Sequence, residues 1–395
     1  MRDLGTVVRG IRTPIIKEGD DLESIVVDAV MNASKNNHFE FHDKDVIAIT
    51  EAVVGISEGN YATVDEVSQD IKNKFNNPEE LGVVFPILSR NRFSLILKAI
   101  ARSTKKLYVL LSFPSDEVGN GILDEDKLEK SKFNMGSIIS EDEYKKYFGD
   151  WIHPFTGINM IDFYRDLIKG EDCEVEFVLS NKATDILKYT KNVLACDIHT
   201  RFKTKKLLEE NGAFVYGLYE IMNSPVGSSG YNEKYGMLGS NKSTEERLKL
   251  FPKSGQSLVE GIQKKLKDLT GCNIEVMVYG DGAFKDPVGK IWELADPVVS
   301  PFYTSGLEGT PNEIKLKYVS DNKFADLSGD ELKDAIKNEI KNKDKDLKGK
   351  MITQGTTPRR LTDLIGSLCD LTSGSGDKGT PVVFIQGYFD NLASE

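Results

Sequence analysis

The sequence predicts a protein of the α+β class that contains more than one structural unit. Two observations lead to this prediction. The 395 residues exceed the usual size of one domain, so two domains, or one core with a large insertion, are expected. Between residues 175 and 221, strand-like apolar runs alternate with helix-like runs at the lengths typical of βαβ units. That alternation favours a small parallel or mixed sheet.

Composition and charge exclude several classes of partner. With 39% hydrophobic and 29% charged residues, the chain has the proportions of a folded globular protein. The net charge of −11 argues against nucleic acid or an anionic membrane as a partner, because both require clustered Lys and Arg. The same acidity favours divalent cations as the positive charge for any phosphate substrate.

Location and redox state follow from what the sequence lacks. No apolar run approaches the roughly 18 residues that a membrane span requires, and residues 1–10 show no secretion signal. The four cysteines lie far apart without a CxxC pair, so we expect free thiols in a reducing cytoplasm.

The first 60 residues predict a strand, a helix and a second strand. A short apolar run at residues 6–8 gives the first strand. Apolar residues at helical spacing then follow between residues 22 and 30, after carboxylates that suit a helix N-terminus. The β-branched run at residues 46–50 gives the second strand, and another apolar run at residues 52–56 precedes a Gly/Asn stop.

A helix at residues 87–102 and a strand at residues 107–113 are predicted next. Asp116 and Glu117 come just past this strand, where a solvated turn and a ligand site are about equally expected. Patterning is poor from about residue 120 to residue 170.

Three strands follow, at residues 175–180, 192–199 and 214–221. Asp197 and His199 fall at the carboxyl end of the second of them, which is the edge where open α/β sheets bind ligands. A structural role is nevertheless the commoner one for a lone Asp and His.

The loop at residues 227–244 nearly matches the phosphate-binding pattern GxxxxGK[ST]. Asn241 occupies the place of the second glycine, and no apolar strand enters the loop, so this interpretation is rejected. A helix at residues 254–271 leads to a strand at residues 273–279, after which Asp281 and Asp286 flank a glycine-containing loop.

The C-terminal part predicts two further helices and a strand. Ser328 and Glu331 give a capping-box pattern at the start of a solvated surface helix. Residues 359–387 then predict a helix, a Gly-rich loop and a buried strand. Because this loop follows a helix C-terminus, whose dipole repels anions, a plain connector is the alternative to a phosphate site.

The order of these units resembles the coenzyme F(420)-0 gamma-glutamyl ligase family. The resemblance lies in GIRTPIIKEGDDLESI, VIAITEAVVGISEG, LGSNKSTEERLKLFPKSGQSLVEGIQKKLKDLTGCNIEVMVYGDGAF, TDLIGSLCDLTSG and KGTPVVFIQG, which occur in the family's order. It implies a mixed-sheet gamma-glutamyl-ligase-like core formed by residues 1–95 and 231–395. Residues 96–230 would then form an inserted α/β segment, of a size that suits a small domain.

The resemblance also implies a reaction. Members of the family use GTP and a divalent metal, magnesium or manganese, to activate an acceptor carboxylate as an acyl phosphate. The amine of L-glutamate then displaces the phosphate. A metal is needed because the carboxylate and the γ-phosphoryl group are both anionic. A cytoplasmic homodimer is implied as well, with no nucleic-acid or membrane partner.

Site residues follow from the same comparison, although no catalytic residue is assigned. The family's strand-end SDT matches Gly280, Asp281 and Gly282, so Asp281 is a metal-ligand candidate. Asp116 and Glu117 are candidate replacement ligands from the insertion. The candidates for nucleotide binding lie in the matching segments: Gly10, Ile11, Thr50, Glu51, Asn241, Gly374 and Ser375.

Departures from the family pattern leave alternatives open. Where the family reads TQKxVSKxEG, this chain reads TEAVVGISEG, with Ala52 and Ile56 in place of lysines that can meet phosphate. Leu238 stands at the acidic position of the family's GxDxSN. One interpretation is an enzyme with a remodelled site, in which Asp116 and Glu117, or Asp197, supply carboxylates. Four arginines could replace the lysines, although surface positions are the commoner role: Arg90, Arg92, Arg359 and Arg360.

The second interpretation is a non-catalytic nucleotide- or metal-binding regulatory protein on the same scaffold. A hydrolase with Asp281 as nucleophile ranks last, because Ala283 occupies the position where a partner acid would be expected.

Overall fold

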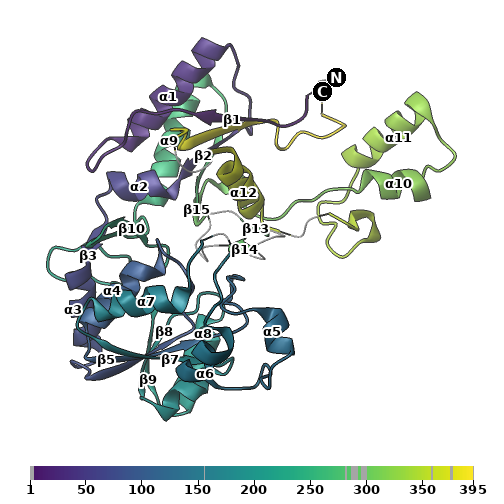
Figure 1. The fold of residues 1–395 in the computed structure, drawn as a ribbon. Coiled ribbons are helices and arrows are strands. Elements are labelled where there is room, and N and C mark those ends of the chain that lie inside the picture. Colours follow the sequence, from purple (N-terminus) through teal and green to yellow (C-terminus); the bar gives the residue numbers. More distant parts are fainter. Residues whose placement is uncertain are drawn as a thin grey trace.

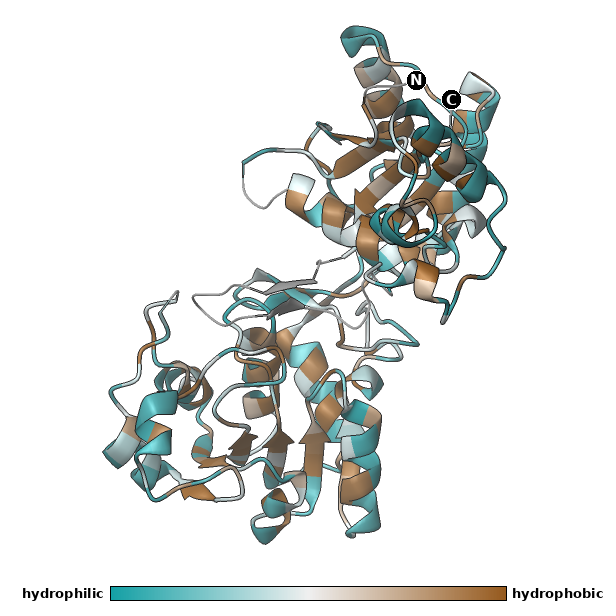
Figure 2. Cartoon of the chain, turned by 90° about the vertical axis from the view of Figure 1, so that its right-hand side faces the viewer, coloured by the Kyte–Doolittle hydropathy of each residue, from teal (hydrophilic) through white to brown (hydrophobic). Residues whose placement is uncertain are grey.

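The computed structural model describes residues 4–154, 156–280, 300–356, 359–373 and 377–394, together with the backbone of residues 283–285 and 292–294. Two large sheets organise the chain, as Figure 1 shows, and helices cover both of them. The mixture of helices and of parallel and antiparallel strands agrees with the predicted α+β class. Figure 2 shows apolar residues along the strands inside each unit and hydrophilic residues on the outer faces of the helices.

The first sheet combines strands from both ends of the sequence. Its order is β1-β16-β2-β12-β15, and β2 pairs with β12 in parallel while the other pairs are antiparallel. The strands are β1 (Val7–Ile11), β2 (Val46–Thr50), β12 (Glu275–Tyr279), β15 (Phe302–Tyr303) and β16 (Val382–Gln386). Helices α1 (Leu22–Asn37) and α9 (Gly255–Thr270) contribute to the core on one face, and α12 (Leu361–Ser373) to the core on the other.

The second sheet has the order β6-β7-β5-β4-β8-β9, and only β6 is antiparallel to its neighbour. Its strands are β4 (Glu80–Val84), β5 (Lys106–Leu111), β6 (Ile139–Ser140), β7 (Glu174–Leu179), β8 (Asn192–Ala195) and β9 (Phe214–Gly217). After building outward from β4 to β7, the chain returns to place β8 on the other side of β4. A reversal of this kind creates the crevice where such sheets commonly bind ligands.

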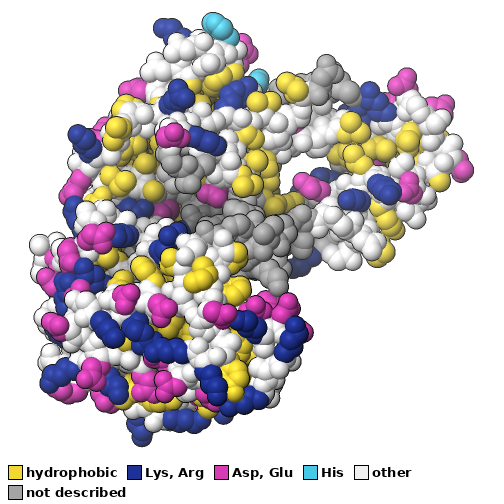
Figure 3. All heavy atoms as spheres, viewed as in Figure 1, with side chains coloured by type: hydrophobic (Ala, Val, Ile, Leu, Met, Phe, Trp, Pro, Cys, Tyr) yellow, Lys and Arg dark blue, Asp and Glu magenta, His cyan; other side chains and the backbone are white. Residues whose placement is uncertain are grey.

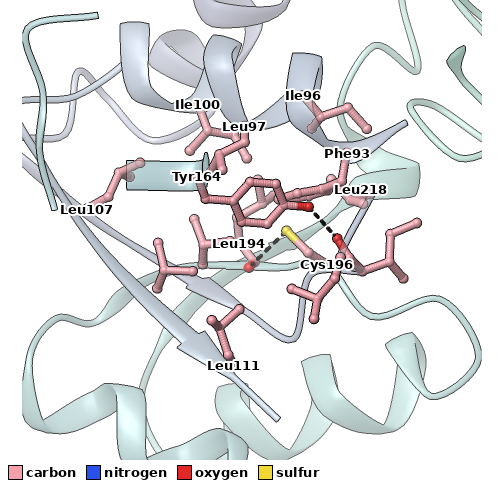
Figure 4. Packing of buried hydrophobic residues seen from close by; sticks show 14 of the residues in the cluster. Phe93, Ile96, Leu97, Ile100, Leu107, Leu111, Tyr164, Leu194, Cys196 and Leu218 are labelled. Atoms are coloured by element: carbon pink, nitrogen blue, oxygen red, sulfur yellow. Dashed lines mark hydrogen bonds between the residues drawn. The ribbon is translucent and has the colours of Figure 1, made fainter. Parts of the chain in front are cut away.

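Helices enclose this second sheet. Residues of α3 (Val64–Lys74), α4 (Phe93–Arg102) and α7 (Met160–Lys169) belong to the larger core, part of which Figure 4 shows around Phe93, Tyr164 and Leu194. The opposite face packs against η1 (Ala183–Lys188) and α8 (Arg201–Glu210). The remaining helices of this unit are α5 (Glu125–Glu129), α6 (Glu141–Phe148) and η2 (Leu218–Glu220).

Smaller elements connect and extend the two units. A three-stranded sheet joins β10 (Asn241–Thr244), β11 (Arg247–Lys249) and β3 (Tyr61–Thr63), next to α2 (Glu51–Ser57). Helices α10 (Leu316–Asn322) and α11 (Gly329–Lys341) form the projection in Figure 1, and Figure 3 shows apolar side chains gathered on it. The other elements are β13 (Ala283–Lys285), β14 (Trp292–Leu294), η3 (Ser305–Leu307) and η4 (Met351–Thr353).

Local sequence explains where several elements begin and end. Strand β2 consists of apolar and β-branched residues that are almost all buried, as expected of a central strand. The Asp21 carboxylate caps α1 by accepting from the Ser24 N–H at 3.1 Å. Helix α9 ends as predicted at Gly271, whose φ of 77° suits the left-handed C-cap.

Several predicted boundaries were wrong. The helix expected from residue 87 begins at Phe93, and the strand expected to reach residue 199 ends at Ala195. The poorly patterned region contains α5, α6 and α7. Ser328 is the N-cap of α11, but its side chain makes no capping hydrogen bond, so the predicted capping box does not form.

The two large sheets use different stretches of sequence. Strands of the six-stranded sheet lie between residues 80 and 217, whereas those of the five-stranded sheet come from residues 7–50, 275–303 and 382–386. The units are joined where the Lys242 N–H donates to the Asn91 carbonyl at 2.9 Å. Strand β4 of the six-stranded sheet lies before residue 96. The division of the chain at residues 95/96 and 230/231 stays a prediction. Within the described residues, no helix is long and apolar enough to cross a membrane.

Candidate functional site

Three strands of the five-stranded sheet end at one edge, and this edge is the candidate site. Strands β1, β2 and β12 run in the same direction, so their carboxyl ends meet. Ile11 pairs with Val382, Val382 pairs with Ile49, and Thr50 pairs with Tyr279. The sheet topology therefore brings together candidates that are far apart in sequence, Gly10 and Ile11 with Thr50 and Glu51.

Three other candidates cannot be placed. Asp281, Gly374 and Ser375 lie outside the described residues. Gly280, the last described residue before Asp281, is buried directly after β12.

A cavity of about 970 Å³ opens beside this edge, between β1, α1 and the segment that precedes β16. Its volume is at the upper end of the range typical of small-molecule sites. Gly10 and Ile11 line it, together with three cationic side chains, those of Arg9, Arg12 and Lys378. Asp28 is the only carboxylate among its described lining residues. The cavity is thus suited to an anionic ligand of nucleotide size.

Arg9 is held in place at this cavity. Its guanidinium carbon lies 4.6 Å from the centre of the Phe39 ring, and its Nη1 donates to Gln386 Oε1 at 3.4 Å. The Phe39 ring in turn stacks on Phe384, with 5.1 Å between the ring centres. These contacts fix one cation at the wall of the cavity.

Glu51 lies at the same edge in a buried ion pair that sequence reasoning missed. Lys249 Nζ lies 3.1 Å from Glu51 Oε2 and 3.3 Å from Oε1, and both residues are less than 10% exposed. Asn241 Nδ2 lies 3.5 Å from Glu51 Oε1, so two predicted candidates also meet here. One signal in the sequence could have identified Lys249, because it interrupts the apolar run LKLF at residues 248–251.

Asp116 has a structural environment. Its buried carboxylate accepts from the backbone N–H groups of Leu88, Val118 and Asn120 and from the Asn120 side-chain amide, at 2.8–3.0 Å. Burial raises the pKa of Asp116, although these hydrogen bonds act in the opposite direction. The interaction with Leu88 ties the loop after β5 to the loop after β4. Both oxygens are therefore engaged within the protein, and a metal-binding role for Asp116 stays a prediction.

Glu117 joins the same loop to the segment after β8. Its carboxylate accepts from the N–H of Ile198 and from the N–H of His199, the latter at 3.0 Å. Loss of water around the carboxylate, together with the smaller effects of the nearby Asp197 and Asp116, raises the pKa of Glu117 to about 7, against the opposing effect of the two N–H donors. Asp197 accepts from the hydroxyls of Thr200 and Thr204 at 2.6 and 2.7 Å. The carboxylates of Asp116 and Glu117 thus join the segments that follow β4, β5 and β8.

The described residues do not form a complete metal site. They contain no group of three or more His, Cys, Asp or Glu side chains that could hold an ion. Leu238, at the position of the family's acid, is 3% exposed and packs in the apolar core. Arg90, Arg359 and Arg360 are exposed. Arg92 lines a small cavity of about 30 Å³ between Phe93 and Ser240, away from the large one.

Comparison with known proteins identifies the family. The sequence profile described as F420-0:Gamma-glutamyl ligase matches residues 10–387, which is nearly the whole chain. The chain therefore belongs to the F420-0:gamma-glutamyl ligase family. No individual curated protein matches it.

Proposed function

We propose, on the premise of membership in the F420-0:gamma-glutamyl ligase family, that this protein is an amide-forming ligase. It would use GTP to activate the carboxylate of a small-molecule acceptor and would join that carboxyl group to the amine of L-glutamate. A cytoplasmic homodimer is part of the same proposal. The observation that carries it is the 970 Å³ cavity with its three cationic side chains beside the common edge of β1, β2 and β12.

The charge of the cavity supports a triphosphate ligand. GTP is strongly anionic, and its binding requires positive charge that a chain of net charge −11 must concentrate locally. Arg9, Arg12 and Lys378 provide such a concentration, with Asp28 as the single described carboxylate in the lining. Arginine can also bind phosphate oxygens through two parallel hydrogen bonds.

The proposed reaction has two steps. In the first, an oxygen of the acceptor carboxylate attacks the γ-phosphorus of GTP, and GDP leaves. In the second, the amine of L-glutamate attacks the carbonyl carbon of the acyl phosphate and an amide bond forms. Inorganic phosphate leaves with the bonding electrons, and the amine gives up one proton to water. Both steps bring anions together, so the cationic lining would act by holding the reactants in position.

Divalent metal, magnesium or manganese, enters the proposal through Asp281, with Asp116 and Glu117 as the further candidate ligands. The described residues supply no full set of ligands, since Asp116 already accepts four hydrogen bonds and Leu238 is apolar. No step is therefore assigned to the ion. Metal would supply charge neutralisation of the phosphates if Asp281 and neighbouring groups bind it.

A specific observation favours a second candidate, a non-catalytic nucleotide-binding regulatory protein. The Leu238 side chain is buried in the apolar core rather than exposed at the surface. This position therefore contributes to packing and supplies no carboxylate. Such a protein would bind GTP in the same cavity without turnover.

The test is phosphate release with the purified protein, GTP, magnesium or manganese, L-glutamate and a panel of carboxylate acceptors. A ligase releases phosphate only when both glutamate and a suitable acceptor are present, and the amide product is then detectable by mass spectrometry. GTP binding without release under any of these conditions would support the regulatory protein. Absence of GTP binding, measured by calorimetry beside GDP and ATP, would contradict both proposals.

A further inference from the structure

Lys249 is a buried cation at the candidate site to which the family resemblance assigned no role. It is 6% exposed and lies against the 8% exposed Glu51. Burying an ion pair removes water from both charges, and such a pair often contributes little net stability compared with apolar side chains. Packing alone therefore does not account for this pair.

The position of the pair points to the ligand. Glu51 is the first residue after β2, at the edge where the nucleotide-binding candidates meet. Asn241 reaches the same carboxylate, with 3.5 Å between its Nδ2 and Glu51 Oε1. The ammonium group of Lys249 therefore lies next to two of the candidates, and Thr50 directly precedes one of them.

Helix α2 explains how Lys249 reaches this place. A Cβ atom on Gly55 would lie 3.2 Å from Lys249 Cδ and 3.4 Å from its Cγ, so the lysine stem crosses the helix where a side chain is missing. The same helix carries Ala52 and Ile56 at the two positions that hold lysine in the family pattern. This helix thus contacts a cation from β11 through Glu51 and Gly55.

We propose that Lys249 supplies the phosphate-binding charge that Ala52 and Ile56 no longer provide. This inference rests on the proposed function, in which the phosphates of GTP approach the edge of the sheet. An ammonium group has three N–H donors, so it can donate to a phosphate oxygen while it keeps its contact with Glu51. Glu51 then has a positioning role, because it holds the ammonium group at the edge before the nucleotide arrives.

Two variants separate this role from simple charge pairing. Glu51→Gln keeps Lys249 but removes the buried negative charge, whereas the double variant Glu51→Gln with Lys249→Met removes both charges together. Binding of magnesium GTP and of guanosine is measured by calorimetry for each, with Lys264→Met on the exposed face of α9 as the matched control. The urea unfolding midpoint of every variant is recorded beside the affinities.

The expected result is a difference between the two variants for GTP only. The double variant binds GTP about 10- to 100-fold more weakly than Glu51→Gln, the value of a hydrogen bond to a charged group. Guanosine, which has no phosphate, binds equally to both. The Lys264→Met control matches the native chain.

Equal GTP affinities for the two variants would overturn the inference while leaving the proposed function intact. If the native chain itself binds no GTP, the proposed function fails and this inference fails with it. If the double variant does not fold, Gly55→Ala provides the second test, since a methyl group there presses on the stem of Lys249 and on the Leu250 carbonyl oxygen, both at 3.2 Å, without changing any charge. Unchanged GTP affinity in a folded Gly55→Ala variant would likewise overturn the inference.

Discussion

Replacing Asp116 with alanine should destabilise the protein more than any surface change. The substitution removes the acceptor of four hydrogen bonds and leaves the buried N–H groups of Leu88 and Val118 without a partner. Each unsatisfied buried donor costs about 1–3 kcal/mol, so these two together cost roughly 2–6 kcal/mol. Asn120 is only partly buried, and water can replace its lost contacts.

Urea unfolding followed by circular dichroism measures this loss. With a slope of about 2–3 kcal/mol per molar urea, a loss of about 3 kcal/mol lowers the midpoint by roughly 1 M. Glu129→Ala is the matched control, because Glu129 is an exposed carboxylate on α5. A chelator provides the second arm of the experiment and should leave the midpoint of the native chain unchanged.

Two results would refute the reasoning. An Asp116→Ala midpoint equal to that of Glu129→Ala would mean that the four hydrogen bonds contribute no net stability. A midpoint of the native chain that falls on adding the chelator, with no effect on Asp116→Ala, would identify the carboxylate as a metal ligand.

Three further predictions concern other parts of the structure. The folded-state pKa of Glu117 is raised from 4.5 to about 7, so its contribution to the free energy of unfolding is present at low pH and is lost as pH rises from 4.5 to 7. Glu117→Gln should flatten that part of a pH titration of the unfolding midpoint. An unaltered slope would contradict the assignment. Gly230→Ala should destabilise by about 1–3 kcal/mol, since its Cβ would lie 2.3 Å from Asn60 Oδ1 and 2.7 Å from the Tyr61 nitrogen, whereas Gly5→Ala meets no atom within 4 Å and should leave the melting temperature unchanged. Arg12→Gln and Lys378→Gln should each weaken GTP binding in calorimetry, because both side chains line the cavity. Neither should shift the melting temperature, because both side chains are exposed. Unchanged GTP affinity in both variants would show that the cavity is not the nucleotide site.

The sequence predicted best those elements whose signal is local. Strand β2 was predicted with its observed bounds, because a fully buried central strand reads as one continuous apolar run. The start of α4 was misplaced because it is not decided locally. Leu88 lies outside the helix with its N–H bonded to Asp116, and the Tyr164 hydroxyl donates to the Ile87 carbonyl at 2.7 Å. Figure 4 shows Tyr164 in the core with a dashed line at its hydroxyl. Those partners are distant in sequence, and periodicity carries no information about them.

The candidate site shows the same division between local and long-range information. Thr50 and Glu51 could be placed at a strand end from sequence, but their proximity to Ile11 depends on how β16 pairs with both β1 and β2. Lys249 was missed because a lysine in an amphipathic strand normally faces solvent. The four hydrogen bonds to Asp116 were not foreseen, because the sequence does not show which donors surround a carboxylate.

The pairing of β1 with β16 imposes an order on folding during synthesis. Val7 pairs with Gln386, so the five-stranded sheet cannot be completed until residue 386 has left the ribosome. The six-stranded sheet is complete once residue 217 has emerged and needs only contacts between nearer segments. The six-stranded sheet can therefore fold first, and this brings the chain segments on either side of it together, where β3 and β11 pair through Ala62 and Leu248. Once this sheet has folded, fewer unfolded residues separate the N-terminal strands from the C-terminal strands. The entropy cost of pairing those strands is therefore smaller.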